Sequence, residues 1–80
     1  MVTLADVKKG LNITDTYRDD ELTMYLDEVL SFLRKAGISE GSITKGVVIV
    51  GVRDLFYGAE GNIGFSDYFY KRASQLAAGG

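Results

Sequence analysis

The sequence contains no cysteine and no histidine among its 80 residues. The absence of cysteine excludes disulfide bridges and thiolate metal sites, and the absence of histidine excludes imidazole ligands and the usual partner of a catalytic nucleophile. A domain of this size buries only about 60% of the surface that its unfolded chain exposes. Without disulfides or a structural metal, contacts with partner chains are its remaining source of added stability. We therefore expect no metal and no cofactor.

Long apolar runs and a strongly basic surface are also missing. The longest apolar stretch, residues 46–51, is far shorter than the roughly 20 residues needed to span a bilayer. The N-terminus lacks the basic and then apolar layout of a signal peptide. A net charge of −2 does not suit a duplex-binding domain, which needs a clustered basic surface. We expect one domain over residues 1–80, with neither a membrane nor sequence-specific nucleic acid as its partner.

The charges that are present are unevenly distributed. Residues 15–28 contain six acidic side chains against Arg18 alone, whereas residues 29–80 contain six basic and four acidic ones. An apolar share of 46% and a charged share of 25% are ordinary for a globular domain. The chain is therefore expected to fold, with one acidic region and a mildly basic remainder.

Two helices are predicted in the first half of the chain. Thr3, followed three residues later by Asp6, is typical of a capping box and predicts a short helix over 3–10. A second helix is predicted over 17–36, because its apolar residues recur every three or four positions and Gly37 stands where a left-handed C-terminal cap is needed. The apolar residues of this second helix are Leu22, Tyr25, Leu26, Val29, Leu30, Leu33 and Ala36.

Residues 47–52 are ambiguous, because their β-branched side chains favour a strand. A strand needs a partner, however, and no other segment combines β-branched residues with alternation. A helix that is apolar all round is instead expected at the centre of a small bundle. The helical interpretation also provides a cap at Ser42 and a stop at Gly58. We therefore predict a third helix over 42–57.

A glycine-rich loop and a last helix complete the chain. Residues 58–64 include three glycines, and Ser66 and Asp67 then provide caps for a helix predicted over 66–78. The predicted fold class is therefore all-α, a small bundle of four helices with no repeat and no proline-rich linker.

The sequence contains no motif typical of catalysis or of metal binding. The acidic segment resembles a calcium loop at first sight, but Asp20 stands at the sixth position, where glycine is required, and Leu26 stands where a bidentate glutamate belongs. The neighbouring carboxylates Asp19, Asp20 and Glu21 suit the first turn of a helix, where they compensate the helix dipole. The glycines of 58–64 follow a helix, whereas those of phosphate-binding loops follow a strand. We predict that the protein is not an enzyme.

Aromatic residues are the most distinctive feature, since six of the nine lie between positions 56 and 70. Core packing accounts for Phe56 and Phe69, but three successive aromatic residues at 68–70 cover about 200° of a helix, wider than one buried stripe. Tyrosine is enriched in interfaces because it adds contact area with few rotatable bonds and keeps a polar tip. The predicted interface residues are Tyr57, Phe65, Tyr68, Tyr70, Lys71 and Arg72. A complementary acidic surface, facing a neighbour or a channel, is predicted at Asp19, Asp20, Glu21, Asp27 and Glu28.

Five short motifs follow one another over nearly the whole chain. The chain opens with Leu4-x-x-Val7-Lys8-x-x-Leu11-x-Ile13, and Asp19-Asp20-Glu21-Leu22 then begins the long helix, which closes at Ala36-Gly37-Ile38. The central apolar helix ends in Phe56-Tyr57, and the last helix ends in Gln75-Leu76. In this order the motifs resemble those of the small head-tail connector, or head completion, proteins of tailed bacteriophages, of the type named after a closing Gln-Leu-Arg-Gly.

Two motifs depart from that family. Ala77 stands in place of the arginine after Gln-Leu, and Gly58-Ala59 replaces an Asn-Arg that often follows the aromatic pair. The resemblance implies a virion protein, made in the host cytoplasm, whose ring docks to the portal protein and extends the DNA channel. It also implies an attachment surface for a stopper or tail-completion protein. A nearly neutral or acidic domain suits such a channel, because phosphate contacts would retain DNA that must slide.

Two other classes of function share parts of this pattern. A small DNA-binding or antitoxin-like regulator would need a basic recognition helix, whereas the long helix here opens with three acids. A generic helical interaction module of a bacterial complex would have the same physical features as a connector. The sequence alone leaves that second alternative open.

Overall fold

The computed structural model describes residues 2–58 and 65–79, and all regular secondary structure within them is helical. The all-α bundle predicted from the sequence is confirmed. Of the predicted glycine-rich loop, residues 59–64 lie outside the described part. The elements are α1 (Leu4–Gly10), α2 (Asp19–Lys35), a short 3-10 helix η1 (Glu40–Ser42), α3 (Lys45–Tyr57) and α4 (Asp67–Gly79).

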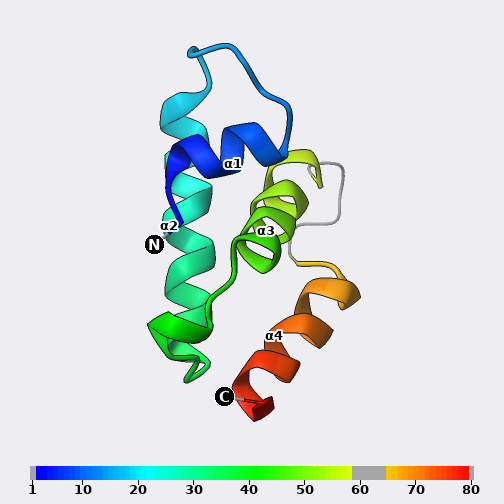
Figure 1. Ribbon diagram of the computed structural model, residues 1–80. Coiled ribbons are helices and arrows are strands. Elements are labelled where there is room, and N and C mark those ends of the chain that lie inside the picture. The colour runs from blue at the N-terminus through cyan, green and yellow to red at the C-terminus, as the bar shows by residue number, and fades with distance from the viewer. Residues whose placement is uncertain (1, 59–64, 80) are drawn as a thin grey trace.

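The central position of α3 organises the bundle. Figure 1 shows α3 between the long α2 and the C-terminal α4, with α1 crossing α2 and reaching α3. α3 thus contacts all three other α-helices, which explains why its sequence is apolar on nearly every side. The β-branched run 47–52 is helical because burial on several faces, and not strand propensity, decides its structure.

Both ends of α1 are fixed by local hydrogen bonds. The Thr3 hydroxyl accepts from the Asp6 amide at 3.3 Å, and the Asp6 carboxylate accepts from the Thr3 amide at 3.0 Å, which confirms the predicted capping box. At the other end Asn12 adopts a left-handed φ of 58°. The amide of Ile13 then donates to the carbonyl of Lys8 at 2.8 Å, a Schellman ending.

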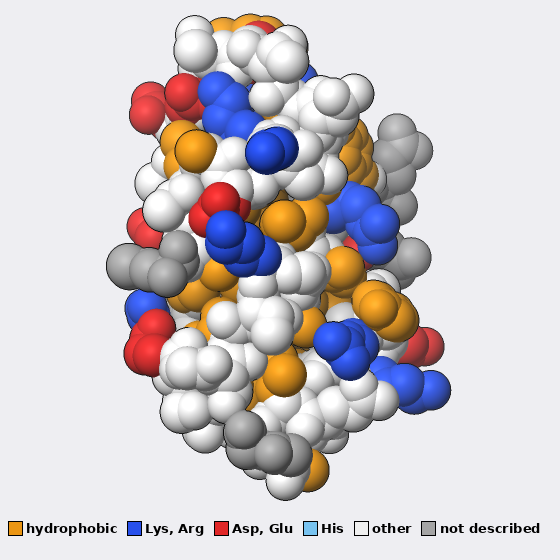
Figure 2. All heavy atoms as spheres, viewed as in Figure 1, with side chains coloured by type: hydrophobic (Ala, Val, Ile, Leu, Met, Phe, Trp, Pro, Cys, Tyr) orange, Lys and Arg blue, Asp and Glu red, His pale blue; other side chains and the backbone are white. Residues whose placement is uncertain are grey.

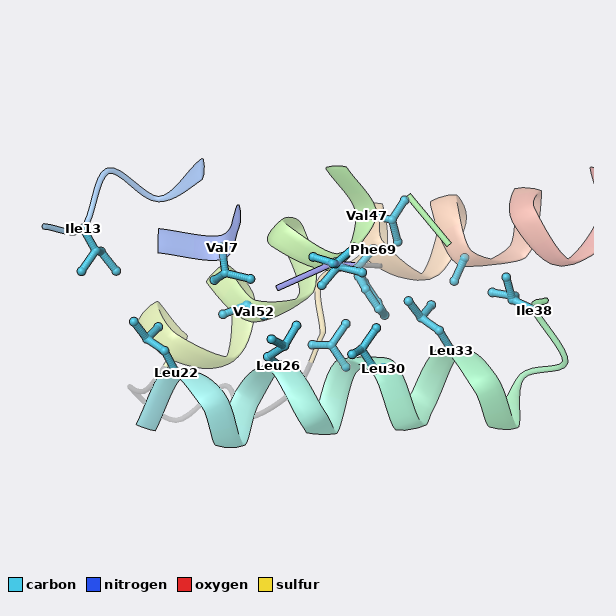
Figure 3. Close-up of a cluster of buried hydrophobic side chains, with 14 residues drawn as sticks. Val7, Ile13, Leu22, Leu26, Leu30, Leu33, Ile38, Val47, Val52 and Phe69 are labelled. Atoms are coloured by element: carbon cyan, nitrogen blue, oxygen red, sulfur yellow. The ribbon is translucent and has the colours of Figure 1, made fainter. Parts of the chain in front are cut away.

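The C-terminus of α2 has the same Schellman ending, with a glycine in the left-handed position. Gly37 has the predicted left-handed conformation, with a φ of 86°, and the amide of Ile38 donates to the carbonyl of Leu33 at 3.2 Å. In both endings the following isoleucine is buried, so each helix end is also attached to the core. Figure 3 shows Ile13 and Ile38 near opposite ends of α2.

Two helices begin two or three residues later than predicted. α2 begins at Asp19 and not at residue 17, because residues 16–19 form a turn in which the Asp19 amide donates to the Thr16 carbonyl at 3.2 Å. α3 begins at Lys45 and not at Ser42, which belongs to η1. Thr44 is extended and caps α3 instead, its hydroxyl accepting from the Val47 amide at 3.3 Å.

The helices surround one apolar core. Figure 3 shows the buried stripe of α2, with Leu22, Leu26, Leu30 and Leu33 directed at side chains of the other elements. No polar or charged side chain of the described residues is buried with them. The buried hydrophobic residues outside α2 are Val2, Val7, Ile13, Ile38, Val47, Val48, Val52, Phe69 and Ala73.

α4 is attached to this core by one large side chain and one carboxylate. Phe69 is fully buried and lies beside Gly51 of α3, while the Asp54 carboxylate accepts from both the amide and the hydroxyl of Ser66, at 2.9 Å and 2.7 Å. The Ser66 hydroxyl accepts in turn from the Phe69 amide at 3.2 Å, as a cap should. The predicted cap at Ser66 is confirmed, with the helix running over Asp67–Gly79 where the sequence predicted 66–78.

Candidate interaction surface

The outer face of α2 carries three of the five predicted acidic residues. Asp20, Asp27 and Glu28 are exposed, and Met24, 58% exposed, lies among them. Their spacing places them opposite the buried leucines of the same helix. These side chains border a shallow depression lined by Asp20, Thr23, Met24, Asp27, Glu28 and Ser31. We call this set the α2 outer face.

The other two predicted acids are engaged within the protein. The Asp19 carboxylate forms an ion pair with the Lys8 ammonium at 2.7 Å, with the two side chains only 34% and 17% exposed. Glu21 accepts a hydrogen bond from the Tyr25 hydroxyl at 3.3 Å. Burial, assisted by this carboxylate, raises the pKa of Tyr25 above its ordinary value. The five predicted acids therefore do not form one surface: three lie on the α2 outer face, and two make contacts within the protein.

The predicted aromatic residues separate into different environments. Phe65 is half-buried and stacks on Phe69 with ring centroids 4.1 Å apart. Tyr70 is 47% exposed and packs edge-on against Phe32 of α2, at 5.8 Å. Phe65 thus belongs in part to the cluster that attaches α4 to α2, whereas Tyr70 forms its rim.

Tyr57 and Tyr68 are more open to solvent. Tyr57, 58% exposed, contacts Phe56 edge-on at the end of α3, with a centroid distance of 4.8 Å. Tyr68 is 56% exposed and has no aromatic partner within the described residues. Because Tyr68 and Tyr70 flank the buried Phe69 at about 100° per residue, they lie on opposite sides of α4. The prediction that at least one residue of the triplet faces outward is confirmed.

The predicted cations lie on the solvent side of α4. Lys71 is exposed, and the half-buried Arg72 donates to the side-chain oxygen of Gln75 at 2.8 Å. Figure 2 shows lysine and arginine side chains spread over the face formed by α1, α3 and α4, with hydrophobic side chains between them. We call Tyr68, Lys71, Arg72 and Gln75 the α4 outer face.

One exposed aromatic contact was missed in the sequence. Tyr17 is 80% exposed, and the guanidinium of Arg18 lies 5.2 Å from its ring centroid and 5.0 Å from that of Phe56. Asp15 orients Arg18 through two hydrogen bonds, and the guanidinium holds the pKa of Asp15 below its ordinary value. No sequence signal links residues 18 and 56, because only the tertiary fold brings α2 and α3 together there.

Metal binding and membrane insertion would each require a particular local structure. Within residues 2–58 and 65–79, no group of three or more acidic side chains is arranged to hold a metal ion. No helix of this described part is both long enough and apolar enough to cross a membrane.

Comparison with known proteins gives no relative. No protein-family model, no curated protein and no solved structure matches this chain. The connector resemblance therefore rests on the order of the motifs described above.

Proposed function

We propose that the protein is a structural adaptor of the bacteriophage neck. Its ring docks to the portal, extends the DNA channel and offers the attachment surface for the stopper or tail. This function places the protein in the virion after synthesis in the host cytoplasm and requires no catalytic residue. Two observations support the proposal. One is the order of the sequence motifs, and the other is that four of the five tyrosines are between 47% and 80% exposed.

Exposed tyrosines on so small a domain favour a role in assembly. Each ring offers a large contact area with few rotatable bonds, and such residues often dominate the binding energy of interfaces. A short chain without cysteine or histidine has few other means of gaining stability. Burial of these rings between subunits would supply both affinity and stability.

The direct test measures the mass of the purified protein by light scattering coupled to size exclusion. The protein is analysed over a concentration series, first alone and then with the portal protein of the same phage. A ring, or a monomer that co-elutes with the portal, supports the adaptor. A protein that stays monomeric and does not co-elute with the portal protein contradicts the proposal. That result favours a helical interaction module of another complex.

The tyrosines of α4 provide a mutational test of the same proposal. We expect Tyr68→Ala combined with Tyr70→Ala to leave the helical circular dichroism signal in place and to weaken assembly, because both rings are exposed. Tyr25→Phe is the matched control, since Tyr25 is half-buried and loses only the hydroxyl that contacts Glu21. Unchanged association of the double variant would remove both tyrosines from the interface.

A further inference from the structure

We propose that neighbouring copies join through two different helices, with the α2 outer face of one copy receiving the α4 outer face of the next. Met24 meets the Tyr68 side of α4, and the acids of α2 lie opposite Lys71 and Arg72. This inference rests on the proposed function and names the two surfaces that build the ring. It also assigns the acids of α2 to a neighbouring subunit and not to the channel.

The first support is that the α2 outer face has no charge partner of its own. Asp20, Asp27 and Glu28 form no ion pair with any described residue. Met24 is an exposed thioether at the centre of these acids, in the shallow depression that they border. Methionine adapts to irregular surfaces and contacts aromatic rings favourably, so this depression suits a partner that brings an aromatic side chain and positive charge.

The α4 outer face has the complementary chemistry. Lys71 forms no ion pair with any described residue, and the hydrogen bond of Arg72 goes to the neutral Gln75. Tyr68 is exposed beside these cations and has no aromatic contact within the described residues. The α2 outer face therefore carries acids without cations. The α4 outer face carries two cations and an exposed ring, with the exposed Asp67 one turn before Lys71 as its neighbouring acid.

Four ion pairs neutralise charges elsewhere in the described residues and leave the charges of the two faces free. Within the same residues, Lys9, Lys35 and Arg53 also lack an ion pair, as Lys71 and Arg72 on α4 do. The four pairs are Lys8–Asp19, Arg18–Asp15, Arg34–Glu40 and Lys45–Asp6.

The α4 outer face is short enough to lie within the α2 outer face. The α2 outer face runs from Asp20 to Ser31, about 16 Å along the helix, whereas the α4 outer face runs from Tyr68 to Gln75, about 10 Å. A contact between different patches leaves each copy with one free face of each kind, so it propagates and closes into a ring where the rotation permits. A symmetric contact of α2 with α2 would oppose like charges.

Chemical cross-linking tests the contact directly, because the chain has no cysteine of its own. A mixture of Met24→Cys and Tyr68→Cys proteins, treated with a short bis-maleimide alone and with the portal protein, should yield mixed dimers. The double variant should yield a ladder of higher multiples. The control pairs Lys9→Cys, exposed on α1, with Tyr68→Cys. No cross-link in either condition, or an equal yield in the control, overturns the inference.

Charge reversal gives an independent test. Asp27→Lys with Glu28→Lys, or Lys71→Glu with Arg72→Glu, should each weaken association by about tenfold, and mixing the two variants should restore it. High salt should weaken association of the unaltered protein. Failure of the mixture to associate overturns the pairing of these faces.

The outcomes separate this inference from the function on which it rests. Rings or portal binding, without the expected cross-links and without rescue by the charge-reversed mixture, would show that the α2–α4 contact is wrong. The proposed adaptor function would then still be supported. If the protein neither assembles nor binds the portal, both are wrong.

Discussion

Gly51 is the residue at which α2, α3 and α4 meet. A Cβ atom added there would lie 2.6 Å from Cε1 of Phe69 and 2.9 Å from Cγ1 of Val29, shorter than real carbon contacts. Neither neighbour can withdraw, because both are fully buried. The missing side chain at position 51 is thus what allows Phe69 to reach the core.

We expect Gly51→Ala to lower the free energy of unfolding by about 1–3 kcal/mol through overpacking, despite the helix propensity that alanine adds. Urea unfolding followed by circular dichroism measures the change. Gly46→Ala, in the first turn of the same helix, is the control, because a Cβ there meets no atom within 4 Å. It should leave stability unchanged or raise it by up to about 0.5 kcal/mol. An equal loss of unfolding free energy in both variants would show that overpacking at position 51 is not the cause.

At the scale of elements, α4 depends on a small set of attachments. α1, α2 and α3 contact one another. α4 joins them through Phe69 and its neighbouring rings, through Ala73 and Leu76 packed on the core, and through the Asp54–Ser66 hydrogen bonds. The carboxylate of Asp54 positions Ser66, and the Ser66 hydroxyl caps the helix that carries Phe69. The start and the docking of α4 are therefore coupled.

We predict that Asp54→Ala destabilises α4 more than the rest of the bundle. The change leaves the partly buried amide of Ser66 without its acceptor, which costs about 1–3 kcal/mol. Hydrogen exchange should accelerate at the amides of Phe69 and Tyr70, with α1 and α2 little affected. Lys9→Ala, exposed on α1 and outside both proposed contact faces, should leave the pattern unchanged. A uniform acceleration in all helices would show that α4 has no separate stability.

At the scale of the whole molecule, the absence of histidine leaves no side chain with an ordinary pKa between about 5 and 8. The shifted groups lie outside this range. A backbone hydrogen bond from Thr3 lowers the pKa of Asp6, and the hydrogen bond from Arg34 lowers that of Glu40. Burial raises the pKa of Tyr25. Stability should therefore depend on pH mainly at the two extremes.

The direction in which each group changes stability with pH follows from the linkage between protonation and folding. Carboxylates with a lowered folded pKa contribute stability above their ordinary values of 3.8 and 4.5, and that contribution is lost as pH falls through the folded values. Tyr25, with a raised pKa, contributes stability below 10, which is lost as pH rises further. We expect a flat Tm from about pH 5 to 8 and a fall on both sides. Asp6→Asn with Glu40→Gln should reduce the fall in Tm at acid pH, with the contribution of Asp15 remaining, and an unchanged fall would exclude Asp6 and Glu40 as its cause.

The local structure of the protein could be predicted from its sequence. The Thr3 capping box, the left-handed Gly37 and the helices α1, α2 and α4 follow from interactions between residues at most five apart, and such interactions are encoded in spacing and residue type. The local propensity of α3 favours a strand, and its helix depends on burial among the other helices. The outward direction of Tyr68 and Tyr70 followed in the same way from helical geometry. The sequence therefore determined where helices form and which side chains leave the core.

Only the tertiary structure decided which surface residues remain available to a partner. Asp19 and Asp20 are equivalent in the sequence, but the crossing of α1 pairs Asp19 with Lys8 and leaves Asp20 on the outer face. Arg18 likewise meets Phe56 only because α2 packs on α3. Such contacts join positions far apart along the chain, and their selection depends on the packing of whole helices, which no local pattern specifies.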